Sequence, residues 1–256
     1  MPQPTVLKGG LVAVTGGSRG LGAAMTVSLL RRGFRVAALS RSGAQPEGIG
    51  TDPVLQERLL VRACDVNNDG DLVRCFAELD KEPGGLRALV NNAGVHTAGA
   101  SARFSTADFE ATLRTNTMAI FSASREAYPY LKKTGGVIVN IGSVFESLGA
   151  AQNACYSASK AAVGALTRSL ASEWARDDIA IINVAPGYVA TDMNTEYLAR
   201  EDVKAYFARQ TLIGRPAQPS EVGDIIAGLL DMDLMLLTGQ TLRADGGHSI
   251  AHGYIR

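Results

Sequence analysis

The 256-residue chain lacks the features that define several large classes of protein. No apolar run reaches the roughly 18 residues that a membrane-spanning helix requires, and the first residues lack the apolar core of a signal peptide. Lysine plus arginine and aspartate plus glutamate number 25 each, so the basic excess of a nucleic-acid-binding protein is missing. We therefore expect a cytoplasmic protein whose partners are neither membranes nor nucleic acids.

Cysteine is scarce as well, and its pattern argues against two kinds of site. Cys64, Cys75 and Cys155 are scattered without Cys-x-x-Cys spacing, so neither a disulfide framework nor a zinc site is indicated. The three histidines form no metal-ligand spacing, and we assign no metal. In contrast, apolar residues are plentiful: 46% of the chain is hydrophobic and 20% is charged, which is enough for a substantial core.

Short β-rich segments alternate with longer amphipathic stretches along the chain. The expected strands are Leu11–Thr15, Arg35–Leu39, Leu59–Cys64, Ala88–Asn91, Val137–Ile141, Ala180–Val184 and Thr241–Arg243. The expected helices are Leu21–Arg32, Asp69–Leu79, Ser105–Leu131, Ser157–Arg176 and Ser220–Met232. This alternation predicts an α/β fold, a Rossmann-like, doubly wound, seven-stranded parallel sheet with helices on both faces. With no linker or repeat, residues 1–256 are expected to form a single domain.

Two regions interrupt this alternation. Ser42–Pro53 is rich in glycine and proline, which predicts that the connection after the second strand is mostly loop. Residues 190–219 hold charged and aromatic residues with little strand character and follow a Pro-Gly turn. This second region is either a lid over a substrate pocket or a plain surface excursion.

A glycine-rich turn lies between the first strand and the first helix. Gly16, Gly20 and Gly22 let the chain turn tightly and allow a ligand to approach the backbone, and the helix that follows offers amide donors to a pyrophosphate. The spacing is not Gly-x-Gly-x-x-Gly, and no Lys-Ser/Thr pair makes it a nucleotide-triphosphate loop. Its position favours dinucleotide binding over a purely structural turn.

The residues at the end of the second strand indicate which dinucleotide. NAD-selective folds place an acidic residue here, whereas this chain has Ser40 and Arg41. Arg41 would reach a 2′-phosphate with charge-assisted donors, helped by Ser40, and Arg19 in the glycine turn would add a second cation. NADP(H) is therefore favoured over NAD(H), the alternative being that Arg41 points into solvent.

Tyr156 and Lys160 stand four residues apart on an expected helix, and Ser143 lies thirteen residues upstream. A four-residue spacing places two side chains on one helix face. The lysine charge is expected to lower the pKa of the tyrosine and make it a usable general acid or base. A lone Tyr-x-x-x-Lys motif is weak evidence, because it also occurs on solvated helix faces.

Taken together, the segments resemble the short-chain dehydrogenase/reductase family in its single-domain form, in particular carbonyl reductases similar to 3-oxoacyl-acyl-carrier-protein reductases. The resemblance runs through nearly the whole chain. It is carried by Thr15–Gly22, Asp65-Val66, Asn91-Asn92-Ala93-Gly94, Asn116, Ser143, Tyr156 with Lys160, Pro186-Gly187, Thr191 and Asp245-Gly246-Gly247.

This resemblance implies a full set of cofactor contacts. Asp65 should bond the adenine amino group beside Val66, Asn92–Gly94 should line the adenosine ribose, and Lys160 should bond the nicotinamide ribose. The implied cofactor residues are Gly16, Ser18, Arg19, Gly20, Leu21, Gly22, Ser40, Arg41, Asp65, Val66, Asn92, Ala93, Gly94, Tyr156, Lys160, Pro186, Gly187, Val189 and Thr191.

The resemblance also implies catalytic roles for Asn116, Ser143, Tyr156 and Lys160. Ser143 and Tyr156 would polarise a substrate carbonyl, Tyr156 would give its proton to oxygen as hydride arrives, and Lys160 would stabilise the phenolate. Asn116 would hold a water that links Lys160 to solvent. The expected reaction is reduction of a ketone or β-ketoacyl carbonyl to a secondary alcohol.

The substrate is expected to contact Ser143, Phe145, Gln152, Tyr156 and Tyr188, with Phe145 and Tyr188 forming an aromatic wall. Glu146 is a candidate for one further polar contact. Each of the residues outside the catalytic set is open to the alternative of ordinary packing at the rim of a pocket.

Three functions stay open, namely an NADPH-dependent carbonyl reductase, an NAD-linked secondary alcohol dehydrogenase and a dinucleotide-sensing protein without catalysis. Retention of all four catalytic residues argues against the third. Lys132 and Lys133 lie beyond the helix end at which carrier-protein reductases expose cations, which puts carrier docking in doubt. By resemblance, the Asn116 and Tyr156 helices should form the interface of a homotetramer or dimer.

Overall fold

The computed structural model describes residues 7, 9–191 and 195–251. Seven strands form one parallel sheet in the order β3-β2-β1-β4-β5-β6-β7. The strands are β1 Leu11–Thr15, β2 Arg35–Ser40, β3 Leu59–Ala63, β4 Leu86–Asn91, β5 Gly136–Ile141, β6 Ile179–Pro186 and β7 Thr241–Ala244. The winding direction reverses between β1 and β4, which is where an open α/β sheet forms its ligand crevice.

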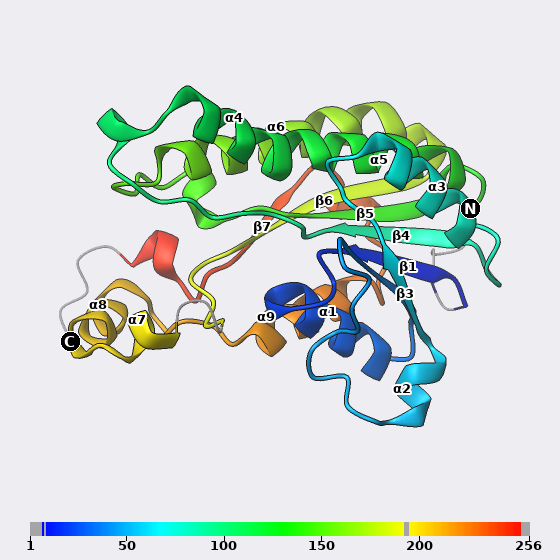
Figure 1. The fold of residues 1–256 in the computed structure, drawn as a ribbon, viewed down its shortest axis with the longest axis horizontal. Coiled ribbons are helices and arrows are strands. Elements are labelled where there is room, and N and C mark those ends of the chain that lie inside the picture. Colours follow the sequence, from blue (N-terminus) through cyan, green and yellow to red (C-terminus); the bar gives the residue numbers. More distant parts are fainter. Residues whose placement is uncertain (1–6, 8, 192–194, 252–256) are drawn as a thin grey trace.

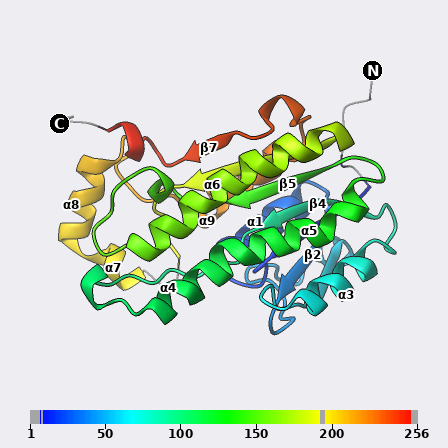
Figure 2. The same ribbon diagram turned by 90° about the horizontal axis from the view of Figure 1, so that it is seen from above.

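Helices cover both faces of the sheet, which confirms the predicted fold class (Figure 1). One face carries α1 Gly20–Arg31 and α9 Pro219–Leu229, with the short α2 Pro53–Glu57 beyond them. The other carries α3 Asp69–Leu79, α4 Thr106–Leu113, α5 Ala119–Leu131 and α6 Ala154–Trp174. From above, α6 runs beside the α4–α5 line (Figure 2).

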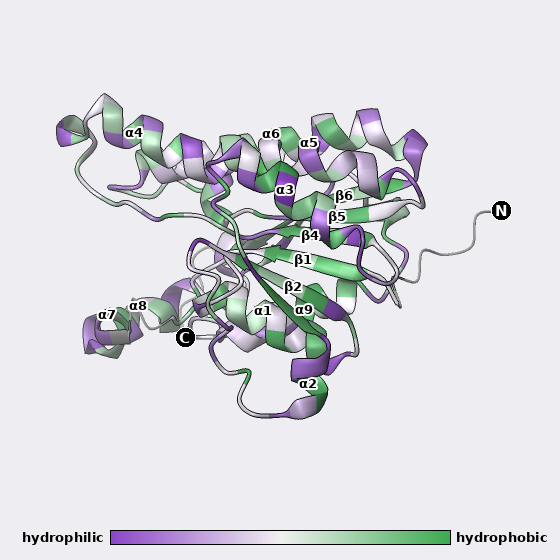
Figure 3. Ribbon diagram, turned by 45° about the vertical axis from the view of Figure 1, so that its right-hand side comes forward, coloured by the Kyte–Doolittle hydropathy of each residue, from purple (hydrophilic) through white to green (hydrophobic). Residues whose placement is uncertain are grey.

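The core is built by strands in which most residues are hydrophobic, drawn in green in Figure 3. Alternate residues of β1 enter different clusters, because successive strand side chains point to opposite sides. Val12 and Val14 pack in the cluster below α1 and α9, whereas Leu11 and Ala13 pack in the cluster below α3 and α5. All four are fully buried.

Two expected helix limits were wrong in ways that matter for the site. The stretch Ser105–Leu131 is not one helix, because the π-helical segment Arg114–Met118 separates α4 from α5 and holds the fully buried Asn116. A π-bulge inserts an extra residue into a helical turn and is often found at functional sites. The Tyr156 helix also starts at Ala154 rather than Ser157, which puts the tyrosine in the first turn of α6.

The connection after β2 is mostly loop, as predicted. Its only helix is α2, whose N-terminus is capped by Asp52 accepting from the amide of Val54.

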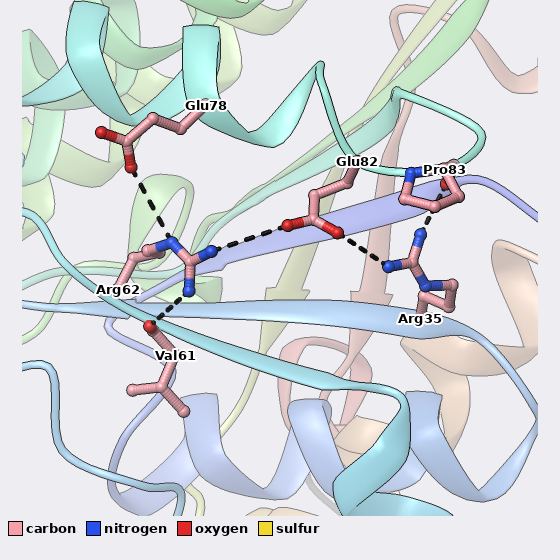
Figure 4. Close-up of polar contacts among 6 residues, drawn as sticks. All are labelled: Arg35, Val61, Arg62, Glu78, Glu82 and Pro83. Atoms are coloured by element: carbon pink, nitrogen blue, oxygen red, sulfur yellow. Dashed lines mark hydrogen bonds and ion pairs between the residues drawn. The ribbon is translucent and has the colours of Figure 1, made fainter.

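A cluster of polar side chains holds the edge strand β3 in place (Figure 4). Arg35 and Arg62 both contact Glu82 at 3.0 and 3.6 Å, and Arg62 also faces Glu78 at 3.8 Å. These pairs tie β2 and β3 to the end of α3 and the turn after it.

The segment expected as a lid leaves the sheet after β6 and contains α7 Thr195–Ala199 and α8 Glu201–Gln210. Figure 1 shows both helices beyond the end of the sheet, apart from the two helix layers. Its base is closed by backbone hydrogen bonds from Ala190 to Ala217 and from Ala217 to Tyr188, at 2.8 and 2.9 Å. Positions 192–194 of the expected lid lie outside the described residues. Across the described part of the chain, no helix is both long and apolar enough to cross a membrane.

Candidate active site

The glycine-rich turn is built against the end of β4. Gly16 has φ of +65°, a conformation that favours glycine, and a Cβ at Gly22 would lie 2.1 Å from the carbonyl oxygen of Gly16. Asn92 Nδ2 donates to the Thr15 carbonyl at 2.9 Å, and Thr15 Oγ1 accepts from the amides of Asn92 and Ala93, both at 3.0 Å. The predicted cofactor residues of β1, α1 and β4 therefore meet at one place.

An acidic residue that the sequence did not reveal also reaches this turn. Glu47, in the loop after β2, accepts a hydrogen bond from the Gly20 amide at 2.9 Å, and its own amide donates to the Ser18 carbonyl at 2.9 Å. The carboxylate thus lies at the N-terminus of α1, where the helix dipole favours negative charge. Because Glu47 belongs to an irregular loop, no periodicity in the sequence signals this contact.

The end of β2 carries the residues expected to select the cofactor. Ser40 has a buried Oγ without a hydrogen-bond partner among the described residues. Arg19 and Arg41 are exposed, and neither guanidinium pairs with a carboxylate in the part of the chain that the structure describes. At the end of β3, Asp65 accepts from the amide of Asn67 at 3.0 Å. These groups line one edge of the sheet.

Ser143, Tyr156 and Lys160 come together where β5 meets α6. Ser143 follows β5 and is buried, its Oγ accepts from the Phe145 amide at 3.3 Å, and its hydroxyl acts on Tyr156 by lowering the pKa of the tyrosine. Lys160 is also buried: its Nζ donates to the carbonyl of Ile141 at 2.7 Å and lies 5.8 Å from the centroid of the Tyr156 ring. The three predicted catalytic side chains therefore occupy one site.

The expected fall in the tyrosine pKa was wrong for this form of the protein. Desolvation raises the pKa of Tyr156, and hydrogen bonding to Ser143 opposes this only in part. The Lys160 ammonium does not compensate, because its hydrogen bond goes to the Ile141 carbonyl and burial lowers its own pKa to about 8. At neutral pH the Tyr156 hydroxyl is therefore protonated and can donate a proton.

Asn116 fixes the backbone beside Lys160. Its Oδ1 accepts from the Val95 amide at 2.8 Å, while Nδ2 donates to the Val95 carbonyl at 2.9 Å and to Ser159 Oγ at 3.0 Å. A Cβ on Gly94 would lie 3.2 Å from Asn116 Oδ1 and 3.8 Å from Lys160 Nζ. Both amide donors of Asn116 are thus engaged in protein contacts, and the side chain holds the loop after β4 against α6.

The turn after β6 brings the remaining predicted cofactor residues to the same edge. Pro186 ends β6 and pairs with Ala244 of β7. A Cβ on Gly187 would lie 3.0 Å from the backbone of Asp245, so the turn packs closely on the residues after β7. Val189 forms the bridge to Ala217 that closes the base of the lid segment, and Thr191 follows it.

A cleft of about 370 Å³ opens next to the catalytic group. Ser143, Tyr156 and Lys160 are not among its lining residues, and Phe145 connects the two, because its ring lines the cleft and lies 6.3 Å from that of Tyr156. Phe145 and Tyr188, both predicted to contact substrate, line it together with Asn153. Gln152, predicted beside them, is absent from this lining: it is exposed, with φ of +63°, and its carbonyl accepts from the Gly99 amide at 2.8 Å. The lining also includes Tyr206 and Gln210 of α8 and His248, which the sequence did not indicate.

Glu146 lies behind the site rather than in the cleft. Its Oε2 accepts from Asn183 Nδ2 at 2.7 Å, and a Cβ on Gly164 would lie 3.3 Å from the same oxygen. From this position the carboxylate raises the pKa of Lys160, against the larger effect of burial. Its effect on the site is therefore electrostatic, through the lysine.

Residues 10–202 match the family described as short chain dehydrogenase. The chain belongs to this family. It is similar to carbonyl reductase family member 4 of Danio rerio, with 36% identity over 93% of this chain and 97% of the relative. It is also similar to the 3-oxoacyl-(acyl-carrier-protein) reductase of Homo sapiens, with 35% identity over 92% of this chain and 96% of the relative.

Among solved structures, ElxO with NADP bound superimposes with a TM-score of 0.83 at 26% identity, over 94% of this chain and 99% of its own. These relatives agree with a nicotinamide-dependent oxidoreductase that acts on a CH–OH group or the corresponding carbonyl. The family membership predicted from the motifs is therefore confirmed.

Proposed function

We propose that this short-chain dehydrogenase is an NADPH-dependent carbonyl reductase that converts a ketone to a secondary alcohol. The observation that carries the proposal is the joint placement of Ser143, Tyr156 and Lys160, with a tyrosine whose raised pKa keeps it protonated at neutral pH. A proton donor of this kind suits reduction, in which an alkoxide must be protonated, better than binding alone.

The residues at the sheet edge fit a dinucleotide. The glycine turn opens α1, a Cβ on Gly20 would meet no atom within 4 Å, and Ser40 offers a buried hydroxyl without a partner among the described residues. Arg41 and Arg19 are the residues that would hold a 2′-phosphate, which supports NADPH over NADH. A bound reduced nicotinamide supplies the hydride. Thr15, Asn92 and Ala93 keep the turn in place through the hydrogen bonds described above.

In the proposed reduction, the chain's own residues place and protonate the substrate oxygen. The hydroxyls of Ser143 and Tyr156 both donate to the carbonyl oxygen, and these bonds strengthen as negative charge develops on it. Tyr156 then gives up its proton, and the Lys160 ammonium stabilises the phenolate. Asn116 keeps Lys160 beside the loop after β4. We propose that α7 and α8 form a lid that limits the access of water to the cleft.

We further propose that the protein works in the cytoplasm as a homotetramer or dimer. Met118 and Phe121, near the α4–α5 junction, are 60% and 41% exposed. These exposed apolar side chains support an interface formed by the α4–α5 line and α6 of two subunits.

The experiment that tests the proposal is oxidation of NADPH and NADH, followed at 340 nm, over a panel of ketones, diketones and β-ketoacyl thioesters. We expect turnover with NADPH and a loss of roughly 10²- to 10⁴-fold in Tyr156→Phe, the usual contribution of a general acid. A preference for NADH would favour the alternative function, an NAD-linked secondary alcohol dehydrogenase. If both cofactors bind and no substrate turns over, the sensing function gains support.

A further inference from the structure

Aromatic side chains are scarce in this chain, at 6% of residues, yet five of them form one connected array at the active site. The ring of Phe145 lies 6.3 Å from that of Tyr156 and 5.7 Å from that of Tyr188, both nearly perpendicular. Tyr188 in turn lies 5.0 Å from Phe207 and 6.2 Å from Tyr206. The array leads from the catalytic tyrosine to helix α8.

Packing of a core does not account for the whole array. Phe207 is fully buried and anchors α8, but Tyr206 is 40% exposed and lines the cleft. Tyr188 and Phe145 are half-buried and line it as well. Edge-to-face rings present both faces and edges to a neighbour, and a further ring inserted among them gains contacts of the same kind.

The cleft is also free of fixed charge along its described lining. It contains no lysine, arginine, aspartate or glutamate. Its one imidazole, His248, has a pKa lowered by burial, against the smaller opposite effect of Asp245. A charged substituent placed there would lose water without gaining an ionic partner, which is costly. Asn153 and Gln210 supply neutral polar groups instead.

The cations near the end of α5, the helix considered above for docking of a carrier protein, are engaged within the chain. Lys132 and Lys133, the cations near the end of α5, pair with Asp177 at 3.3 Å and with Asp80 at 2.6 Å. Arg125 on the same helix is engaged by Asp69 and Glu126. Each of these three cations is half-exposed but has a carboxylate partner, so this end of α5 offers an acidic carrier protein no unpaired cation among them.

We propose that the substrate is a neutral ketone borne on an aromatic or fused alicyclic ring, which inserts among Phe145, Tyr188 and Tyr206, rather than an acyl thioester on a carrier. A cleft of about 370 Å³ suits a ligand of one or two rings. This inference rests on the proposed function, because the ring must place its carbonyl against Ser143 and Tyr156.

The kinetic test compares three ketones with NADPH: 1-tetralone, the acyclic 2-decanone and the N-acetylcysteamine thioester of acetoacetate. We expect the kcat/KM for 1-tetralone to exceed the other two by at least about tenfold. Tyr206→Leu should reduce the ratio of 1-tetralone to 2-decanone by about 3- to 10-fold, mainly through KM, since an aromatic pair contributes on this scale. Tyr206→Phe should keep the ratio, and Tyr130→Leu, on α5, should leave all three rates unchanged.

A binding test separates failure of this inference from failure of the proposed function. Titration calorimetry with 2-naphthol and with 2-decanol in the presence of NADP⁺ should show tighter binding of 2-naphthol, weakened by Tyr206→Leu. If 2-naphthol binds in this way but no ketone is reduced, the aromatic cleft stands and the carbonyl reductase proposal fails. Equal binding of the two alcohols, or preferred turnover of 2-decanone or the thioester, would overturn the inference.

Discussion

The carboxylate of Glu47 accepts a hydrogen bond from the Gly20 amide at 2.9 Å, at the N-terminus of helix α1. An anion already occupies a donor of the turn proposed to hold the cofactor phosphates. An anion gains about 0.3–1 kcal/mol at a helix N-terminus, and the carboxylate and a phosphate compete for this gain. We predict that Glu47→Gln tightens NADPH binding about two- to fivefold, and NADH binding less, because NADH lacks the 2′-phosphate.

This prediction is measured as a dissociation constant, from the fluorescence of the reduced cofactor on titration with protein. Glu57→Gln provides the matched control, since Glu57 is an exposed carboxylate in the same connection but on α2. Unchanged dissociation constants for both cofactors in Glu47→Gln would show that the carboxylate moves aside on binding and does not compete.

The pH dependence of reduction should report the buried lysine. Burial lowers the pKa of Lys160 to about 8, while Glu146 raises it. Below about pH 8 the ammonium is present to stabilise the tyrosine phenolate, and above it this charge is lost. We predict that kcat/KM for the ketone falls as pH rises through about 8, and that Glu146→Gln moves this limb to lower pH.

The same shift has a consequence for stability with a definite sign. The pKa of Lys160 in the folded protein lies below its ordinary value of 10.5, so between about pH 8 and 10.5 the unfolded chain binds more protons at this residue. Its contribution to stability therefore becomes more favourable as pH rises through that window. In the kinetic measurement, a pH dependence of kcat/KM in Glu146→Gln that coincides with that of the wild type would show that Glu146 does not raise the pKa of Lys160.

The fold could be predicted from the sequence because buried parallel strands leave a simple pattern. The expected strand Leu11–Thr15 coincides with β1, and the others differ from the structure by a few residues at their ends. Each strand can be located from its own apolar residues and from the turns that flank it. The interruption of α4–α5 at Arg114–Met118 could not be found in this way, because a π-bulge retains helical composition and depends on the packing of Asn116 against Val95 and Ser159.

The candidate site was predicted best where residues are fixed by short motifs. Ser143, Tyr156 and Lys160 meet as the motif implies, since their positions follow from the end of β5 and one face of α6. The pKa of Tyr156 was not predictable, because desolvation depends on residues distant in sequence. Glu47 escaped prediction for a related reason: its loop reaches α1 only through tertiary contacts.

A buried polar network between the sheet and the helices above it should be important for stability. Asn91 Nδ2 donates to Asn140 Oδ1 at 2.9 Å and to Ser124 Oγ at 3.0 Å, and Asn140 Nδ2 donates to Thr167 Oγ1 at 2.9 Å. All four residues are buried. We predict that Asn140→Ala lowers the free energy of unfolding by about 2–4 kcal/mol, because it leaves buried partners unsatisfied and removes side-chain packing.

Urea unfolding monitored by circular dichroism measures this loss. Asn67→Ala serves as control, since the exposed Asn67 side chain makes a single hydrogen bond to the described residues, to Thr115 at 3.3 Å. A change of less than about 0.5 kcal/mol in Asn140→Ala, the range of ordinary surface substitutions, would mean that water replaces the missing amide.

The lid proposal predicts that α8 can open without the rest of the fold. Phe207 is the fully buried anchor of α8, and its ring contacts Tyr188 at 5.0 Å between centroids. Removing a buried phenylalanine ring costs about 3–5 kcal/mol. If α8 opens locally, Phe207→Ala should raise the rate of thermolysin cleavage within residues 195–218 at least about tenfold, with a smaller effect on the urea midpoint of the sheet.

Lys204→Ala, on the exposed face of the same helix, is the control and should be cleaved at the wild-type rate. Cleavage that starts in the sheet or in α6 instead would mean that this segment unfolds only together with the core, and the lid interpretation would then fail.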